Sequence, residues 1–399
     1  MAEFQVTLED ARGEPIRGIT ARFLVAATRT LLTGRTDSSG QVRWNMPSGA
    51  AKGRLEIGPI PNHWSIADKC DVSKDPSRRF RAESLSSAEQ GFGWWHRSVG
   101  VAIGREARGK GISIGVIDTG CGPHPALKHV EAVGTFIDGH VAAGIEDEGE
   151  HGSHVCGIIT ASPSKPDLFA GIAPDARCMA ARVSLPGRYA NQGDIADALD
   201  AIVKKGAHLV NLSLAAYRPS PALIDSIANA WVNGVVCFAS AGNDGGDVMW
   251  PARHELVVAV TALGRASEVP AGSIAHLLLD GAKAIDAASN FVFPDFCSRG
   301  LGVNCCAPGV GIVSTIRSDN SSAGGAWADM SGSSMASPLA LGVLACLLSE
   351  NDEYLQMPAD EERSQKAIEI LETQCLPLDL LEDFQGNGLL MLELGYPTI

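Results

Sequence analysis

Two patterns of hydrophobic and polar positions divide the chain. From Phe4 to about Ile60, short runs such as FQVTL and ARFLVA alternate apolar with polar residues, and turn-forming stretches such as DSSG separate them. Such alternation is typical of strands with one buried face, so we expect a small antiparallel β-domain here. From about Gly93 onward, the apolar residues instead form continuous runs and helical stripes.

The continuous runs have the length of strands and occur at residues 112–117, 178–183, 207–214, 235–240 and 256–260. Strands of this kind need cover on both faces, as in a parallel sheet. Apolar residues at helical spacing lie between the runs and include Ile195, Leu199, Ile202, Leu223 and Ile227. We therefore predict an α/β fold, with a doubly wound, mostly parallel sheet, helices on both faces, and a small N-terminal all-β domain.

Composition places the boundary between these two domains. Residues 1–70 are expected to form a small β-sandwich-like accessory domain. Residues 71–92 are polar and carry few large apolar groups, as a linker would. Residues 93–399 remain for the α/β domain.

The charge and the apolar runs exclude two classes of partner. The formal net charge is -14, and the one basic cluster, Arg78, Arg79 and Arg81, is local, so we expect no nucleic-acid partner. The longest apolar stretches reach about ten residues, short of the roughly 18 to 20 that span a bilayer, so we expect no membrane segment.

The cysteines and the start of the chain indicate a compartment. Ten cysteines occur without a CxxC pair, which argues against zinc and favours reduced thiols in the core. The opening sequence, MAEFQVTLED, lacks the features of a secretory signal. We expect a cytoplasmic protein that needs no metal and no other cofactor.

Polar residues follow two of the predicted strands. Asp118 follows residues 112–117 in GVIDTG, and Asn243 follows residues 235–240 in FASAGNDG. In doubly wound sheets, functional side chains collect at the carboxyl ends of strands. Turn formation alone would also explain an Asp or an Asn at these positions.

The motif HGSHVCGI places His151 and His154 at the start of a predicted helix. The helix of zinc proteases has His at i and i+4 with a Glu between them, and neither condition is met here, so a metal pair is disfavoured. His151 and His154 are left as candidates for acid–base chemistry or for packing.

The motif GSSMASP places Ser334 at a predicted helix start. Unpaired backbone N–H groups and the helix dipole favour a developing anion there, as a nucleophilic serine requires. We expect Pro338 in the first turn, where the donor that it lacks would be unpaired in any case. On chemistry alone, Ser333 and Ser337 are alternative nucleophiles.

Taken together, these motifs carry a resemblance to a known family. The chain resembles the subtilisin-like serine proteases (subtilases) over residues 93–399, and the resemblance rests on GVIDTG, HGSHVCGI, FASAGNDG, CAPGV and SGSSMASP. It implies that Ser334 is the nucleophile and that His151 is the general base and then the general acid. Asp118 would hold the imidazole, and Asn243 with the backbone N–H of Ser334 would bind the oxyanion.

The same resemblance implies a substrate-binding segment. Ser213, Leu214 and Ala215 would pair with the substrate backbone as an added strand. Asp244 would lie at the rim of the primary specificity pocket, and Met249 would lie near its floor.

Three further features follow from comparison with the family pattern. Trp250-Pro251 lies where the family often has a cis peptide bond, and we expect one. In HPAL, Ala126 replaces an Asp that often helps to bind calcium, so calcium dependence is not expected from this motif. Between Ala262 and Ser298 the chain is longer than the family core, which indicates an insertion near residues 264–292.

The N-terminal region carries its own, shorter resemblance. The stretch GEPIRGITARFLV resembles carboxypeptidase-regulatory-like β-sandwich modules, which occur beside many enzymes. Residues 1–70 do not look like the usual inhibitory propeptide of the family. We therefore expect this domain to bind a partner or to make a self-inhibitory contact.

Three functions fit the sequence. The first is a serine endopeptidase that hydrolyses protein or peptide substrates through an acyl-enzyme, as an intracellular or processing protease. The second is a peptide transamidase or macrocyclase, in which an amine takes the acyl group and water is excluded. The third is a catalytically silent binding scaffold, against which the presence of Asp118, His151 and Ser334 counts.

Overall fold

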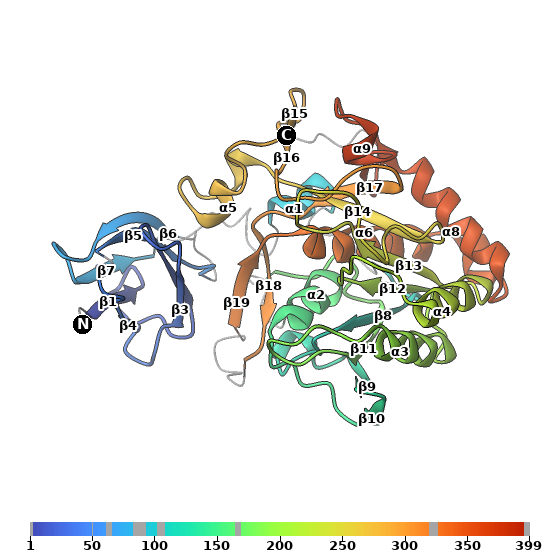
Figure 1. Cartoon of the computed structure of the whole chain (residues 1–399), viewed down its shortest axis with the longest axis horizontal. Coiled ribbons are helices and arrows are strands. Elements are labelled where there is room, and N and C mark those ends of the chain that lie inside the picture. Colours follow the sequence, from blue (N-terminus) through green and yellow to red (C-terminus); the bar gives the residue numbers. More distant parts are fainter. Residues whose placement is uncertain are drawn as a thin grey trace.

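A small β-domain and a larger α/β domain make up the protein (Figure 1). The computed structural model describes residues 3–49, 51–60, 66–82, 93–101, 108–163, 169–318 and 326–394. The fold class predicted from the sequence is confirmed, because a large, mostly parallel sheet follows the N-terminal strands.

The N-terminal domain is built from two facing sheets. One has the order β4 (Gln41–Asn45), β1 (Glu3–Glu9), β7 (Ser77–Arg81), and the other has the order β3 (Leu31–Arg35), β2 (Thr20–Val25), β5 (Lys52–Ile57), β6 (Ile66–Asp71). Three aromatic rings fill the space between them: the ring of Phe4 lies 5.1 Å from that of Phe23 and 5.9 Å from that of Trp44. The alternating apolar residues of the sequence therefore form one shared core.

Strand β7 corrects two of our expectations. Its residues fall in the stretch predicted to be a linker, and it pairs in parallel with β1, so the domain extends to Arg81 and is not wholly antiparallel. The prediction was wrong because β7 is a polar edge strand, with Phe80 its one large apolar residue and charged neighbours on either side. Residues 83–92, the rest of the predicted linker, lie outside the described residues.

A central sheet organises the α/β domain. Its strand order is β10 (His140–Ala142), β9 (Glu131–Ile137), β11 (Arg177–Arg182), β8 (Ser113–Asp118), β12 (Leu209–Leu212), β13 (Val236–Ser240), β14 (Val257–Leu263), β17 (Val303–Pro308), β21 (Leu389–Leu390), β20 (Cys375–Leu376). From β9 to β21 the neighbouring strands are parallel, and β10 and β20 pair antiparallel at the two edges.

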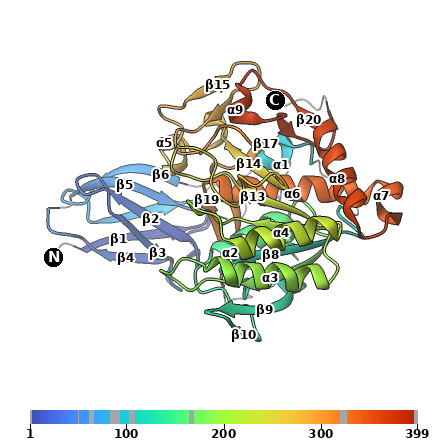
Figure 2. The ribbon, with the colours of Figure 1, turned by 45° about the vertical axis from the view of Figure 1, so that its right-hand side comes forward.

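The strands are mainly apolar because helices cover both faces. Along β8, Ile114 and Val116 contact the core on the side of α2 (His151–Thr160) and α6 (Ser333–Ser349), whereas Ile117 contacts the opposite core. That opposite face is covered by α3 (Gln192–Lys204) and α4 (Pro221–Val232), which lie side by side over the strands in Figure 2.

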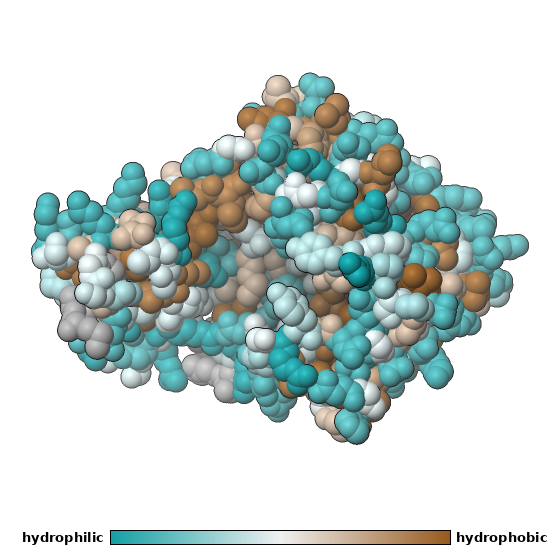
Figure 3. Space-filling model, viewed as in Figure 1, coloured by the Kyte–Doolittle hydropathy of each residue, from teal (hydrophilic) through white to brown (hydrophobic). Residues whose placement is uncertain are grey.

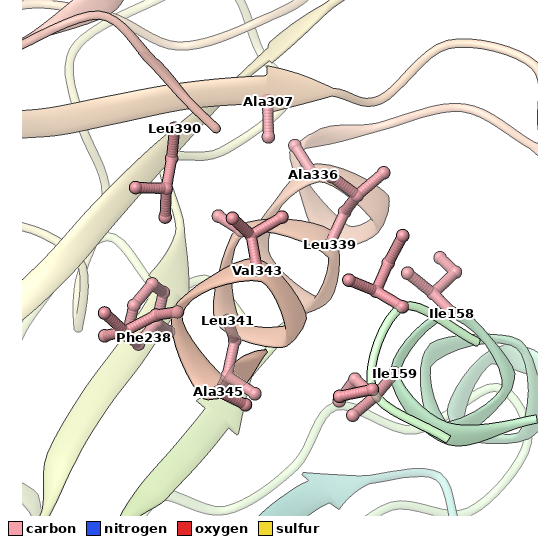
Figure 4. Close-up of a cluster of buried hydrophobic side chains, with 14 of the residues drawn as sticks. Ile158, Ile159, Phe238, Ala307, Ala336, Leu339, Leu341, Val343, Ala345 and Leu390 are labelled. Atoms are coloured by element: carbon pink, nitrogen blue, oxygen red, sulfur yellow. The ribbon is translucent and has the colours of Figure 1, made fainter. Parts of the chain in front are cut away.

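Helix α6 runs through the larger core. Figure 4 shows its side chains among those of α2, β13, β17 and β21, and the residues concerned include Leu339, Leu341, Val343, Ile158, Ile159, Phe238, Ala307 and Leu390. Because α6 is apolar on every side, burial rather than an amphipathic face holds it in place.

The remaining described elements of the α/β domain are α1 (Trp94–Ser98), η2 (Pro125–Leu127), η3 (Ala266–Glu268), α5 (Ile274–Leu277), β15 (Ala284–Asp286), β16 (Phe291–Phe293), β18 (Ile312–Ile316), β19 (Ala326–Met330), α7 (Asp352–Gln356), α8 (Glu361–Thr373) and α9 (Glu382–Gln385). The predicted insertion at 264–292 contains η3, α5, β15 and the start of β16. A helix long and apolar enough to cross a bilayer is not found in the described part of the chain. All ten cysteines are described, and all are buried thiols outside any disulfide, as the sequence led us to expect.

The contribution of α6 to stability can be measured by truncating one buried leucine. Leu341 is fully buried, so Leu341→Ala removes apolar contacts and leaves a cavity that costs about 2 to 5 kcal/mol of unfolding free energy. Leu381→Ala is the control, because Leu381 is 68% exposed and its truncation should change stability by less than about 0.5 kcal/mol. Urea unfolding followed by circular dichroism measures both, and equal losses would contradict the assignment of α6 to the core.

Candidate active site

The predicted site residues gather at the carboxyl edge of the sheet. Asp118 is the last residue of β8, and Asn243 follows the end of β13. His151 is the first residue of α2, and Ser334 lies in the first turn of α6. Two ends of buried strands and two helix starts thus supply all four side chains.

Asp118 and His151 form a direct hydrogen bond. The Nδ1 of His151 lies 2.8 Å from Oδ1 of Asp118, which also accepts the backbone N–H of Thr119 at 2.7 Å. The Asp118 side chain is 1% exposed, whereas that of His151 is 32% exposed. The imidazole is therefore anchored at Nδ1 on a buried carboxylate while the ring still reaches solvent.

The electrostatic surroundings favour a positive charge on this ring. Burial lowers the pKa of His151, but the charge of Asp118 and its hydrogen bond, with a further contribution from Asp147, outweigh burial and raise the pKa above 6.5. A ring with these neighbours can take up a proton near neutral pH and then release it.

Asp147 and Thr119 accept hydrogen bonds from backbone N–H groups in the first turn of α2, the helix that begins at His151. Sequence reasoning missed this capping role. Asp147 accepts the backbone N–H of Ser153 at 2.7 Å and the hydroxyl of Thr119 at 2.9 Å, and that hydroxyl accepts the N–H of Gly152 at 2.8 Å. An Asp before a helix is an ordinary capping signal. Here it was hidden among neighbouring acidic residues in the stretch EDEGE.

Burial distinguishes Ser334 from the other two candidate nucleophiles. Ser333 and Ser337 are fully buried. The hydroxyl of Ser333 bonds Gly242 and Asn243, and that of Ser337 donates to Asn211 at 2.7 Å. Ser334 is only half-buried, so of these three hydroxyls it is the one that a substrate can reach.

The orientation of Asn243 is set by Ser333. Its Oδ1 accepts both the backbone N–H and the hydroxyl of Ser333, each at 2.9 Å. The amide N–H group of this exposed side chain is then the part that faces outward as a donor. A Cβ at Gly332 would lie 3.1 Å from Nδ2, so a side chain at that position would crowd the Asn243 amide.

The position of Pro338 differs from our expectation. Because α6 begins at Ser333, Pro338 lies in the second turn, and the donor that it lacks would have served the carbonyl of Ser334. That carbonyl instead accepts the hydroxyl of Ser213 at 2.8 Å. The proline thus leaves an acceptor free, and a side chain from the end of β12 occupies it.

The remaining predicted site residues lie around this centre. Ser213 is buried and accepts the side-chain amide of Asn211 at 2.9 Å, while Leu214 is half-buried and Ala215 exposed. Asp244 is exposed and accepts the hydroxyl of Ser298 at 2.8 Å, and this bond helps to lower the pKa of its carboxyl.

Met249 lies against the turn that carries Asn243. A Cβ at Gly242 would lie 2.8 Å from Sδ of Met249, so the two residues are in close contact. The peptide bond between Trp250 and Pro251 is cis, which confirms the cis bond predicted from the sequence.

His154 serves packing between elements. It is fully buried, its Nε2 lies 3.0 Å from the carbonyl of Ala328 on β19, and burial lowers its pKa to about 3. Neutral His154 therefore links α2 to β19, the strand that precedes Ser334 in the chain. Among the described residues, no group of three or more His, Cys, Asp or Glu side chains is placed to hold a metal ion.

Comparison with known proteins identifies the family of this chain. The model of the subtilase family, peptidase S8, matches residues 109–388. The chain belongs to the subtilase family. It is therefore a subtilisin-like serine protease, and the resemblance stated from the motifs is confirmed.

Two curated relatives show the range of similarity. The major intracellular serine protease of Bacillus subtilis (strain 168) is 29% identical over 296 residues, which cover 71% of this chain and 82% of that protein. The thermophilic serine proteinase of Bacillus sp. (strain AK1) is 33% identical over 250 residues, which cover 62% of this chain and 54% of that protein. Among solved structures, the S41 psychrophilic protease has a TM-score of 0.62 at 25% identity, covering 77% of this chain and all of that one.

The electrostatics of His151 can be tested by titration. Its raised pKa means that the ring is protonated below, and neutral above, a pH higher than the ordinary 6.5. Asp118→Asn removes the main charge that raises this pKa and should lower it, as followed by NMR of the imidazole nitrogens. Asp138→Asn is the control, because Asp138 is exposed and pairs with Arg188. A His151 pKa at or below 6.5, or one that Asp118→Asn leaves unchanged, would contradict the role given to Asp118.

Proposed function

We propose that the protein is a serine endopeptidase that cleaves peptide bonds through an acyl-enzyme on Ser334. One observation carries the proposal: the hydrogen bond of 2.8 Å between His151 and buried Asp118, at the same sheet edge as the reachable hydroxyl of Ser334. A serine is a weak nucleophile unless a neighbouring base takes its proton, and an imidazole held by a carboxylate is such a base.

The chemical steps follow from these groups. Ser334 Oγ attacks the peptide carbonyl carbon as its proton passes to Nε2 of His151, and the carbonyl oxygen becomes an oxyanion. The C–N bond then breaks while His151 returns the proton to the leaving amine, so that an ester to Ser334 remains. Water, deprotonated by the same imidazole, attacks the ester carbon; the C–O bond to Ser334 then breaks, and the imidazolium returns the proton to Ser334 Oγ as the acid is released. Asp118 stabilises the imidazolium in both halves of the reaction.

The developing oxyanion has two donors in this proposal. One is the amide N–H of Asn243, which Ser333 orients. The other is the backbone N–H of Ser334 in the first turn of α6, where a helix leaves its N–H groups without intrahelical partners. Donors already fixed before the reaction stabilise the charge without reorganisation.

We propose further that the acyl part of a protein or peptide substrate lies along Leu214 and Ala215, with Met249 and Asp244 shaping the primary pocket. Two of these residues, Ala215 and Asp244, are exposed at the sheet edge, and Ser213 is bonded to the carbonyl of Ser334. The segment is thereby held next to the nucleophile, which supports its use as a substrate-pairing strand.

We also propose that the protease acts inside the cell. The relative from Bacillus subtilis is named an intracellular serine protease. All ten cysteines are buried and outside any disulfide, and burial raises the pKa of Cys237 and Cys297 to about 12, which keeps them as thiols.

The nucleophile can be tested with a fluorophosphonate probe and a peptide substrate. Ser334→Ala should abolish labelling and lower kcat by about 10⁶-fold, a size known from the equivalent change in subtilisin itself. Ser220→Ala is the control, because the Ser220 side chain makes no capping bond at the start of α4. Labelling that survives in Ser334→Ala would reject Ser334, and absence of labelling in the parent protein would favour a silent scaffold. A product joined to an added amine in place of the hydrolysed acid would favour transamidation.

The oxyanion donor can be tested separately. Asn243→Ala should lower kcat by about 10² to 10³-fold, the loss known for the corresponding donor in subtilisin, with little change in KM because the donor acts in the transition state. Steady-state kinetics with a peptide substrate measure both constants. An effect confined to KM would place Asn243 in ground-state binding instead.

A further inference from the structure

The N-terminal domain makes its contacts with the α/β domain close to the catalytic groups. Its four-stranded sheet, β3-β2-β5-β6, supplies Arg22, Arg35, Arg54 and Glu56 to this interface. In Figure 1 the domain lies beyond β18 and β19, on the side of the molecule where β19 leads into α6. The α/β side of the interface is formed by β19, by the insertion, and by the residues that flank β18 and α2.

Arg22 is the centre of the interface. Its guanidinium donates to Glu56 at 3.0 Å, to the carboxylate of Asp329 at 2.8 Å and to the backbone carbonyl of Asp329 at 2.7 Å. The side chains of Arg22 and Asp329 are each 15% exposed and that of Glu56 is 3% exposed. The positive charge of Arg22 therefore stabilises two buried carboxylates. Arg22 also bonds β19, which ends at Met330, just before the turn to Ser334.

The insertion is part of the same interface. Glu56 accepts the backbone N–H of Ile274, the first residue of α5, at 2.7 Å. Arg54 donates to the carbonyl of Gly272 in the preceding turn. The N-terminal domain is thus bonded both to β19 and to the segment around Gly272 and Ile274. Because these two segments are separate, the bonds fix the orientation of the N-terminal domain relative to the α/β domain.

A third contact reaches the residue before the catalytic histidine. Arg35 donates to the carboxylate of Glu150 and, at 3.1 Å, to the carbonyl of Arg317 at the end of β18. The side chains of Arg35 and Glu150 remain 35% and 40% exposed. This ion pair is partly open to solvent, and its carboxylate belongs to the residue that directly precedes His151.

Docking of the domain leaves the catalytic groups open. With the domain in place, the His151 side chain is 32% exposed, Ser334 is half-buried and Asn243 is exposed. The space-filling view shows the surface hollowed between the two domains (Figure 3). The domain stands beside the site and does not fill it.

The direction in which the substrate leaves indicates which part of it the N-terminal domain would contact. His151 donates its proton to the leaving amine, so the substrate segment on the carboxyl side of the cleaved bond departs past His151. Asn243 and the segment at Leu214 and Ala215, in contrast, bind the part of the substrate on the amino side of the cleaved bond. Glu150 and Arg35, next to His151, therefore border the path of the leaving segment.

From this arrangement, which rests on the proposed function, we propose that the N-terminal β-domain forms the leaving-group wall of the substrate cleft. Its ligand is the peptide segment that follows the cleaved bond. Arg35 is the specificity-determining residue of this wall, and Arg22 is the residue that positions the wall. The protein is accordingly selective for substrates that extend several residues beyond the bond.

The test compares substrates that share one acyl part and differ only after the cleaved bond. A p-nitroanilide has no residue there, and peptides with one, three or five residues extend progressively along the proposed wall. In the full-length protein, kcat/KM should rise with this length. In Arg35→Ala, the ratio of kcat/KM for the longest peptide to that for the p-nitroanilide should fall about tenfold, as for loss of one well-placed interface side chain.

Two further variants separate docking from folding. Arg22→Ala leaves Glu56 and Asp329 without their cation and should remove the length dependence, whereas Arg22→Lys should restore part of it. Arg43→Ala is the matched control: Arg43 lies on β4, in the other sheet of the domain, where it bonds Gln5 and Gln41, and its loss should leave all ratios unchanged.

Either of two results would overturn the proposal. These are a kcat/KM independent of peptide length in the parent protein, and a loss in Arg35→Ala that is equal for the p-nitroanilide and the longest peptide. Fluorophosphonate labelling keeps this failure distinct from failure of the proposed function, because a protease without such a wall is labelled and hydrolyses the p-nitroanilide, whereas a protein that is not a serine protease does neither.

Discussion

The burial of a parallel sheet on both faces is the constraint from which the site follows. Parallel neighbours require crossover connections, and here helices that return over the sheet make them, so strand ends and helix starts meet at one edge. Asp118 and Asn243 leave the sheet at this edge, and α2 and α6 begin there. A carboxylate, an imidazole, an amide and a hydroxyl from distant parts of the sequence thereby come together without any long functional loop.

Helix α6 meets two opposing demands, since it is buried on all sides yet must present one hydroxyl to a substrate. The structure resolves the conflict with a set of polar bonds in its first two turns. Ser337 and Ser213 both bond Asn211, and Ser213 also holds the carbonyl that Pro338 leaves free. A buried polar network in which each of these groups has a partner fixes one arrangement of the turn that carries Ser334.

The sequence predicted what depends on burial and missed what depends on individual polar contacts. The run at 112–117 predicted β8 because a strand covered on both faces is mainly apolar, and the family motifs then located Asp118. Strand β7 was missed because an edge strand is free to be polar. The role of Asp147 was missed because several acidic residues adjoin it and only geometry selects one. Pro338 was misplaced by a turn because the start of α6 depends on contacts of Ser333 that no local pattern reveals.

The interface between the domains joins parts of the chain that are made at very different times. The N-terminal sandwich is closed once β7 has paired with β1, long before the residues that it contacts at Gly272 and Asp329 exist. On the ribosome this domain can fold early, but its interface lacks Asp329, the partner of Arg22, until β19 emerges, shortly before the helix that bears Ser334. The last partner of Arg22 and the nucleophile thus lie within a few residues of each other in the chain, so the interdomain contact and the catalytic centre can be completed only at the same late stage of synthesis.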